Sequence, residues 1–163
     1  MSRRQTTALI SLLRGRLELE AGDDYLYSEV SIAGNVTTYV NNLDKRFKYK
    51  LTSVYVYLDC DATAASRYPV CEKYNIDDVP QSKHASAGVQ TANENGHHLF
   101  MPGISGYVYR ANDPIWADIA MPVGCTLNYG EYLALSITSG VAGDAYDIRM
   151  TFKRIYVPPE DAS

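Results

Sequence analysis

The sequence predicts an all-β protein, and three observations carry that prediction. Residues 131–138 and 145–157 alternate apolar and polar side chains with a period of two. Glycine-containing turn signals separate such runs along the chain, and no run of ten or more residues makes a convincing helix. Successive side chains of a strand lie on opposite faces, so each run has one face for a core and one for water. We expect these two runs to form a β-hairpin around a turn at residues 140–143.

The earlier part of the chain repeats this pattern. In residues 47–58 the first half alternates, whereas the second half is apolar on both faces, as in a strand that runs from a sheet margin into a buried centre. A helix is disfavoured there because Val, Thr and Tyr lose side-chain freedom in a helix and pack well on a pleated surface. The other expected strands are residues 16–20, 25–32, 36–40, 106–111 and 114–120.

About eight strands in a chain of 163 residues predict one domain, an eight-stranded antiparallel two-sheet β-sandwich of jelly-roll type, ahead of another sandwich or a barrel. We place this domain at residues 16–157, after a basic arm at residues 1–15 and before a tail at residues 158–163. Residues 59–102 are long, polar and turn-rich, and we expect a loop excursion there with room for one or two short strands.

The charge is unevenly distributed. The formal net charge is −4, but residues 1–16 hold four arginines and no acid, so the remainder carries −8. Any attraction to a polyanion is therefore expected in the arm and not in the domain; a frayed, solvated terminus is the alternative. The apolar run at residues 8–13 is too short for a secretion signal, so we expect synthesis in a cytoplasm without a cleavable signal peptide. The arginines are Arg3, Arg4, Arg14 and Arg16.

The sequence carries no recognisable catalytic set. The Gly-x-Ser-x-Gly nucleophile elbow, the Cys-x-x-Cys zinc spacing and the phosphate-binding glycine loop are all missing. We therefore expect no enzymatic activity, no cofactor and no metal. Cys60 and Cys71 could form a disulfide or remain buried thiols, and Cys125 is expected to be a packed thiol. The three histidines, His84, His97 and His98, are expected in exposed loops.

Tyrosine is unusually frequent, with 14 residues against three Phe and one Trp. Tyrosine buries a large ring while keeping a hydroxyl for water or a partner, so it suits interfaces. Pairs spaced by two residues would share one face of a strand, which leaves three interpretations open: a protein interface, ordinary sheet packing, or a platform for sugars. The pairs are Tyr25 and Tyr27, Tyr55 and Tyr57, and Tyr107 and Tyr109.

The eight-strand pattern, the arm MSRRQTTALISLLRGR, the Tyr-rich strands and the one long excursion together resemble the single-jelly-roll capsid proteins of small icosahedral viruses. The size is similar to that of small coat and vertex proteins of tailless, membrane-containing bacterial and archaeal viruses. The resemblance implies a virion protein that assembles with itself and with other virion proteins. It also implies an arm that reaches toward a membrane, the genome or a neighbour, although four arginines allow only weak contact with an anionic membrane or nucleic acid.

A second hypothesis belongs to another class. The domain could be a carbohydrate- or receptor-binding module, such as a viral spike head, with a glycan as its partner. In that case Trp116, Tyr107 and Tyr109 would be the stacking surfaces and the segment at residues 59–102 would recognise the ligand. If the domain does not bind a sugar, Trp116 is expected to pack in the core of the domain.

Overall fold

The computed structural model describes residues 16–19, 24–100, 106–108, 115–118 and 125–158. For residues 16–19, 24, 25, 106–108 and 115–118 this description covers the backbone alone. The expected basic arm and most of the expected C-terminal tail lie outside the described residues. Within the described residues the secondary structure is strand and turn, and no helix could span a membrane. The prediction of an all-β protein is confirmed.

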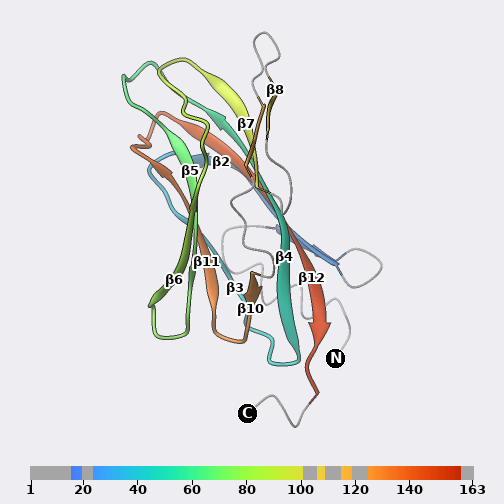
Figure 1. The fold of residues 1–163 in the computed structure, drawn as a ribbon. Coiled ribbons are helices and arrows are strands. Elements are labelled where there is room, and N and C mark those ends of the chain that lie inside the picture. The colour runs from blue at the N-terminus through green and yellow to red at the C-terminus, as the bar shows by residue number, and fades with distance from the viewer. Residues whose placement is uncertain (1–15, 20–23, 101–105, 109–114, 119–124, 159–163) are drawn as a thin grey trace.

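The described part of the chain contains twelve strands rather than eight (Figure 1). They are β1 (Arg16–Leu19), β2 (Asp24–Ala33), β3 (Thr38–Asn41), β4 (Phe47–Asp59), β5 (Tyr68–Tyr74), β6 (Pro80–Ala85), β7 (Asn95–Phe100), β8 (Gly106–Val108), β9 (Ile115–Asp118), β10 (Thr126–Leu127), β11 (Tyr132–Thr138) and β12 (Ala145–Tyr156).

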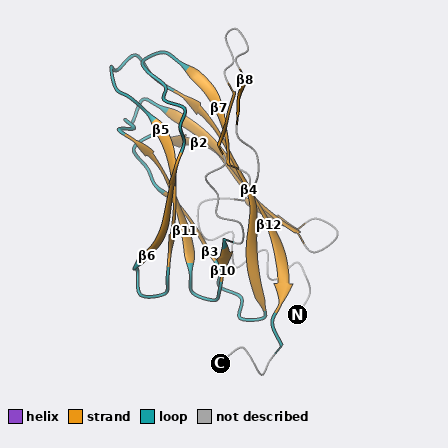
Figure 2. Cartoon of the chain, in the orientation of Figure 1, coloured by secondary structure: helices purple, strands orange, loops and turns teal. Residues whose placement is uncertain are grey.

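Two sheets face each other, as Figure 2 shows. The larger sheet has eight strands in the order β1-β2-β12-β4-β7-β9-β8, with β10 pairing β4 beside this path, and the smaller has four in the order β3-β11-β5-β6. All pairs are antiparallel except β7 with β9, which are parallel. The expected antiparallel two-sheet β-sandwich is confirmed, and the one parallel pair arises where β9 lies between β7 and the edge strand β8.

Eight of the twelve strands, four from each sheet, are considered first. They are β2, β4, β7 and β12 of the larger sheet and β3, β5, β6 and β11 of the smaller one. If these eight are counted along the chain, the first pairs with the eighth, the second with the seventh, the third with the sixth and the fourth with the fifth. The eighth also pairs with the third, and the seventh with the fourth. Along these eight strands the chain therefore changes sheet at every step except between β5 and β6, which are neighbours in the smaller sheet.

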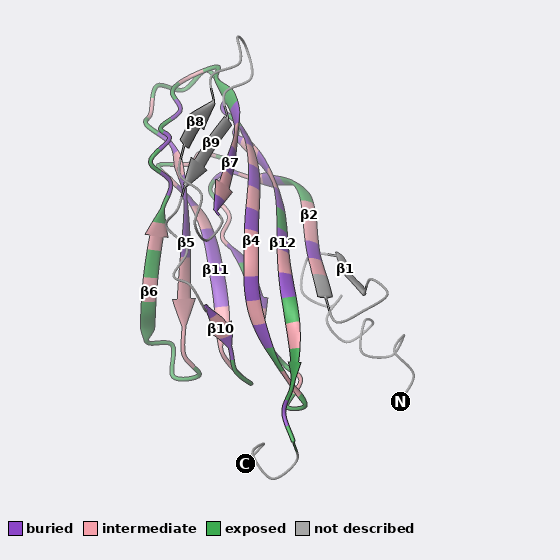
Figure 3. Ribbon diagram, turned by 45° about the vertical axis from the view of Figure 1, so that its right-hand side comes forward, coloured by how far each residue is buried: buried purple, intermediate pink, exposed green. Residues whose placement is uncertain are grey.

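The expected hairpin of the last two long strands is wrong. β11 pairs with β3 and β5 in the smaller sheet, whereas β12 pairs with β2 and β4 in the larger one. The facing of their side chains is nevertheless as expected, since both apolar sets belong to the buried core. Figure 3 colours parts of both strands as buried. These buried residues are Leu133, Leu135 and Ile137 on β11 and Tyr146, Ile148, Met150 and Phe152 on β12.

The segment at residues 59–102, expected as an excursion with room for one or two short strands, contains three strands, β5, β6 and β7. β5 and β6 complete the smaller sheet, and β7 joins the larger one beside β4. The polar side chains of this segment gave no alternating pattern from which strands could be predicted. In β6, for example, an edge strand, the residues are largely exposed. An edge strand needs no apolar face to be held by its backbone hydrogen bonds.

Candidate functional site

The predicted interface tyrosines lie in different environments. Tyr27 is 3% exposed, packs in the core and donates a hydrogen bond from its hydroxyl to Glu29, 2.7 Å away. Its position matches ordinary sheet packing, one of the interpretations that the sequence left open. Tyr55 and Tyr57 lie on the outer face of β4, half-buried, on either side of His97 from β7.

His97 is held by both of these tyrosines. The Tyr55 and His97 rings stack with centroids 5.7 Å apart, and a 2.6 Å hydrogen bond joins the Tyr55 hydroxyl to His97 Nδ1. The Tyr57 ring lies 4.9 Å from the same imidazole. The side chains of Tyr25, Tyr107 and Trp116, and the whole of Tyr109, lie outside the described residues, as do Arg3, Arg4 and Arg14; only the backbone of Arg16 is described.

A more exposed group of tyrosines lies on the outer face of the smaller sheet. We call Tyr39 of β3, Tyr132 of β11 and Tyr74 of β5 the tyrosine face. The Tyr74 and Tyr132 rings are parallel, 6° apart in plane and 4.9 Å between centroids, and the Tyr39 ring meets Tyr132 edge-on at 5.9 Å. Tyr39 is 51% exposed. Three aromatic rings thus form a continuous row across three neighbouring strands.

Charged groups anchor the hydroxyls of this row. Tyr132 donates to Asp78 at 3.0 Å, and Tyr74 donates to Glu72 at 2.9 Å; Glu72 also pairs with Lys83 at 3.0 Å. Partial burial and the Asp78 carboxylate raise the pKa of Tyr132 to about 12, and the Lys83 ammonium lowers the pKa of Glu72. Both phenols therefore stay protonated near neutral pH, and fixed hydroxyls hold the ring faces in one arrangement.

The sequence pattern could not reveal this row. Each tyrosine stands on a different strand, and only the register brings Tyr132 opposite Tyr74 and Ala134 opposite Tyr39. The sequence prediction used pairs of tyrosines spaced by two residues within one strand, and those pairs are other tyrosines. The usable hint is positional, since Tyr39, Tyr74 and Tyr132 each occupy the non-core face of their strand.

A buried ionic cluster ties the loops together at the opposite end of the sandwich. The Arg67 side chain has no exposed surface, and its Nε donates to Asp144 Oδ2 at 2.6 Å while a terminal nitrogen donates to Asp61 Oδ1 at 2.9 Å. The Asp144 carboxylate also accepts the backbone N–H groups of Asp61 and Val141. Burial raises the pKa of Asp144, but these N–H groups and the Arg67 guanidinium outweigh it and hold the pKa below its usual value.

A second buried polar chain lies beside this cluster. His98 of β7 is fully buried and hydrogen-bonds Ser86 at 2.8 Å and Gln90 at 2.7 Å, and the Gln90 amide donates to the carbonyl of Leu58. Burial, assisted by His97, lowers the pKa of His98 to about 3, so its ring is neutral. Because Gln90 Oε1 accepts from Nε2, the neutral ring accepts from the Ser86 hydroxyl at Nδ1.

The histidine prediction is therefore wrong. His84 lies on β6, while His97 and His98 lie on β7 with their rings on opposite faces, so none of the three stands in an exposed loop. All three cysteines are free and buried, and burial raises the pKa of Cys60 and Cys71 to about 12. Across the described ranges, no group of three or more His, Cys, Asp or Glu side chains could hold a metal ion.

Neither a protein-family model nor a curated protein matches this chain. Several solved structures match this chain. The structure of the infectious bursal disease virus Gx strain matches at a TM-score of 0.36 and 14% identity, covering 91% of this chain and 34% of that one. A subviral particle of VP2 from infectious bursal disease virus matches at 0.33 and 15%, covering 88% and 33%. The chain thus spans about a third of the length of either matched chain.

Proposed function

We propose that this chain is a non-enzymatic structural protein of a virus particle, a jelly roll that assembles with copies of itself through the tyrosine face. Its place would be the virion, with other virion proteins as further partners. The observation that carries the proposal is the pairing order of the eight layer strands, together with an exposed aromatic row on one sheet.

The pairing order supports a jelly roll. First-with-eighth, second-with-seventh, third-with-sixth and fourth-with-fifth pairing is the order of one long antiparallel ribbon. Rolling that ribbon separates its pairs alternately into two sheets, which matches the observed orders β2-β12-β4-β7 and β3-β11-β5-β6. A double-sheet jelly roll of eight strands has this architecture and is common in shell proteins.

The buried polar groups support a structural role over a catalytic one. Arg67, Asp144, His98 and Gln90 hydrogen-bond one another or the backbone, and they join the β4–β5, β6–β7 and β11–β12 loops at one end of the sandwich. A rigid loop end suits a subunit that must present the same contacts in every copy.

The tyrosine face supports contact with another protein. Its rings are large, two of them are fixed by the hydroxyl bonds of Tyr74 and Tyr132, and the Glu72–Lys83 ion pair lies beside them. Protein interfaces likewise combine aromatic centres with polar rims. A contact between identical faces would be closed by a two-fold axis, and a contact with a different surface would build rings or shells.

Light scattering coupled to size-exclusion chromatography, with electron microscopy of the peak, tests this proposal. The full chain is expected to form oligomers or particles, and Tyr39→Asp is expected to yield folded monomers. Tyr129→Asp is the matched control, because Tyr129 is similarly exposed at 45% but its ring contacts Lys45 and is not part of the tyrosine face. A wild-type chain that stays monomeric at high micromolar concentration contradicts the proposal.

The same samples test the other class of function. If the wild-type monomer binds sugars on a glycan array and Trp116→Ala abolishes that binding, the domain is a receptor-binding module instead. Trp116 is the appropriate residue to change, because it is the side chain predicted from the sequence to stack on a sugar.

A further inference from the structure

Cations are concentrated in two short segments of an otherwise acidic chain. Residues 45–50 contain four Lys or Arg and residues 149–154 contain three, without an acid in either segment. Together they hold seven of the fifteen basic residues of a protein whose net charge is −4. The net charge therefore conceals a strong local separation of charge.

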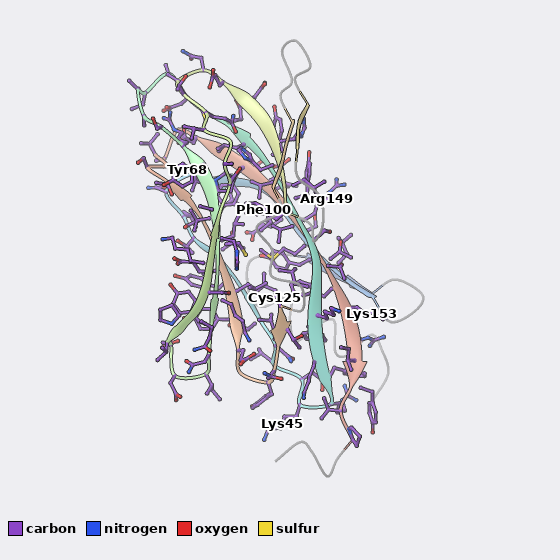
Figure 4. All side chains as sticks on the ribbon, viewed as in Figure 1. Lys45, Tyr68, Phe100, Cys125, Arg149 and Lys153 are labelled. Atoms are coloured by element: carbon purple, nitrogen blue, oxygen red, sulfur yellow. The ribbon has the colours of Figure 1, made fainter. Side chains whose placement is uncertain are left out.

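The register of β4 with β12 brings the two segments side by side. Lys50 stands opposite Lys153, Lys48 opposite Ile155, and Arg149 opposite Tyr55. Phe152 and Tyr49 point into the core, so the alternating lysines point outward. Figure 4 shows Arg149 and Lys153 on the side of the larger sheet that faces away from Cys125, which lies between the sheets. We call Lys48, Lys50, Arg149 and Lys153 the basic strip.

The members of the basic strip lack ion pairs within the described part of the chain. Lys73 and Lys83 elsewhere pair with Glu131 and Glu72, and Arg67 pairs with two aspartates. Lys48, Arg149 and Lys153 are instead exposed, and Lys50 is half-buried. Four positive charges are thus presented to the surroundings without neutralisation.

The opposition of Lys50 and Lys153 is informative. Like charges directly opposite each other in an antiparallel pair are destabilising. Lysines often protect edge strands, but β4 and β12 are interior strands at this row, since Lys50 also faces Thr126 of β10 and Lys153 faces Asp24 of β2. Edge protection therefore does not account for the pair, and a bound anion would relieve the repulsion.

Among the described residues, the acids in register with the basic strip stand on the side of β1 and β2, and Asp44, next to the first cationic segment, pairs with Arg46. Asp24 of β2 stands opposite Lys153 in the register, and Glu18 of β1 stands opposite Leu26, whose partner on β12 is Thr151. Asp147 lies farther along β12, and its carboxylate accepts the backbone N–H of Ser31. The positive field therefore runs along β4 and β12.

We propose that the basic strip binds single-stranded nucleic acid through its phosphates. The strip continues along the same face of β4 into the cluster of Tyr55, His97 and Tyr57, and cations beside aromatic rings are the chemistry that holds such strands without sequence preference. A membrane surface is a weaker match, because Ile155 is the one large aliphatic side chain that the described residues of β4 and β12 expose. This binding goes beyond assembly and does not require it.

Fluorescence anisotropy with a labelled oligothymidine of about 20 nucleotides tests the proposal on the unassembled full chain. The strip variant is Lys48→Gln/Lys50→Gln/Lys153→Gln, and the matched control is Arg3→Gln/Arg4→Gln/Arg14→Gln, which removes equal charge from the arm. Each phosphate contact of a single strand contributes about 0.7 to the salt slope, so the strip variant should lose a slope of about 2. For equal affinities at 1 M salt, this is about 100-fold weaker binding at 0.1 M salt.

The control separates the strip from the arm and from net charge. The arm variant is expected to keep most of the wild-type affinity, and circular dichroism melts are expected to show both variants folded. Equal losses in the two variants, an unchanged strip variant, or a wild-type chain that binds phosphatidylserine vesicles but not the oligonucleotide at low salt would each overturn the proposal. Because binding is measured on monomers, the result can be interpreted even if the chain does not assemble.

Discussion

Arg67 is the largest of the fully buried side chains, and its charge is balanced by Asp144, which is itself 1% exposed. Removing one partner of a buried ion pair leaves an uncompensated charge, which costs far more than the pair contributes. The cluster also fixes the turn between β11 and β12, because Asp144 accepts the N–H of Val141. The Arg67 side chain thus links the loop between β4 and β5 to the loop between β11 and β12, which lie far apart in the sequence.

Arg67→Met is expected to destabilise the domain by about 3–5 kcal/mol, because it leaves the Asp144 carboxylate buried without its cation. Urea unfolding followed by circular dichroism measures the change. Lys83→Met is the control, since Lys83 is an exposed partner of Glu72, and it should change stability by less than about 1 kcal/mol. Similar small effects of both substitutions would show that the buried cluster is not important for stability.

His98 predicts a pH dependence of stability. In the unfolded chain its pKa is near 6.5, whereas in the folded protein burial lowers the pKa to about 3. Between these values the unfolded state binds more protons, so stability is complete above about pH 6.5 and falls as the pH is lowered. Burial lowers the pKa of His84 as well, which acts in the same direction.

The loss of stability between pH 6.5 and 5 should be on the order of 1–2 kcal/mol, before most carboxylates titrate. Urea midpoints at pH 7, 6.5, 6, 5.5 and 5 measure it. His98→Gln removes the titrating ring, so its midpoint should depend less on pH in this window whatever its absolute stability. An unchanged slope in that variant would assign the effect to another group.

At the scale of elements, β11 and β12 show what the sequence can and cannot predict. The period of two assigned Leu135 and Ile148 to buried faces, and both are completely buried. It did not identify the partners of either strand, because alternation describes one strand while pairing depends on residues far along the chain. For the same reason the sequence did not predict β5 to β7. It also did not predict the tyrosine face or the basic strip, because each brings together residues of different strands through the register of their pairing.

Leu135→Ala and Ile148→Ala are each expected to cost about 2–5 kcal/mol, because each leaves a cavity in the core between the sheets. Denaturant melts of the two variants test this expectation. Arg149→Ala is the control on β12, since its side chain is exposed and should contribute about 0.5 kcal/mol or less. A neutral Leu135→Ala or Ile148→Ala would contradict the observed facing of that strand.

At the scale of the whole molecule, the domain does not depend on the arm for its described pairing. The larger sheet begins with β1, whose residues from Arg16 onward pair with β2. Among the described side chains, the first that belongs to the core is Tyr27. The arm's sequence has a different character, with Arg3, Arg4 and Arg14 flanking the apolar residues 8–13 and no acid among them. Such a segment suits docking on an anionic or apolar surface.

Deletion of residues 1–14 is therefore expected to leave the melting temperature of the β-domain unchanged within about 2 °C while impairing assembly or attachment to an anionic membrane. Three phosphate or headgroup contacts are few, so any attachment should weaken steeply with salt. Thermal melts, light scattering and co-sedimentation with phosphatidylserine vesicles measure the three properties on one preparation. A deletion that unfolds the domain would make the arm part of the core, and a deletion that changes nothing would make it a solvated terminus.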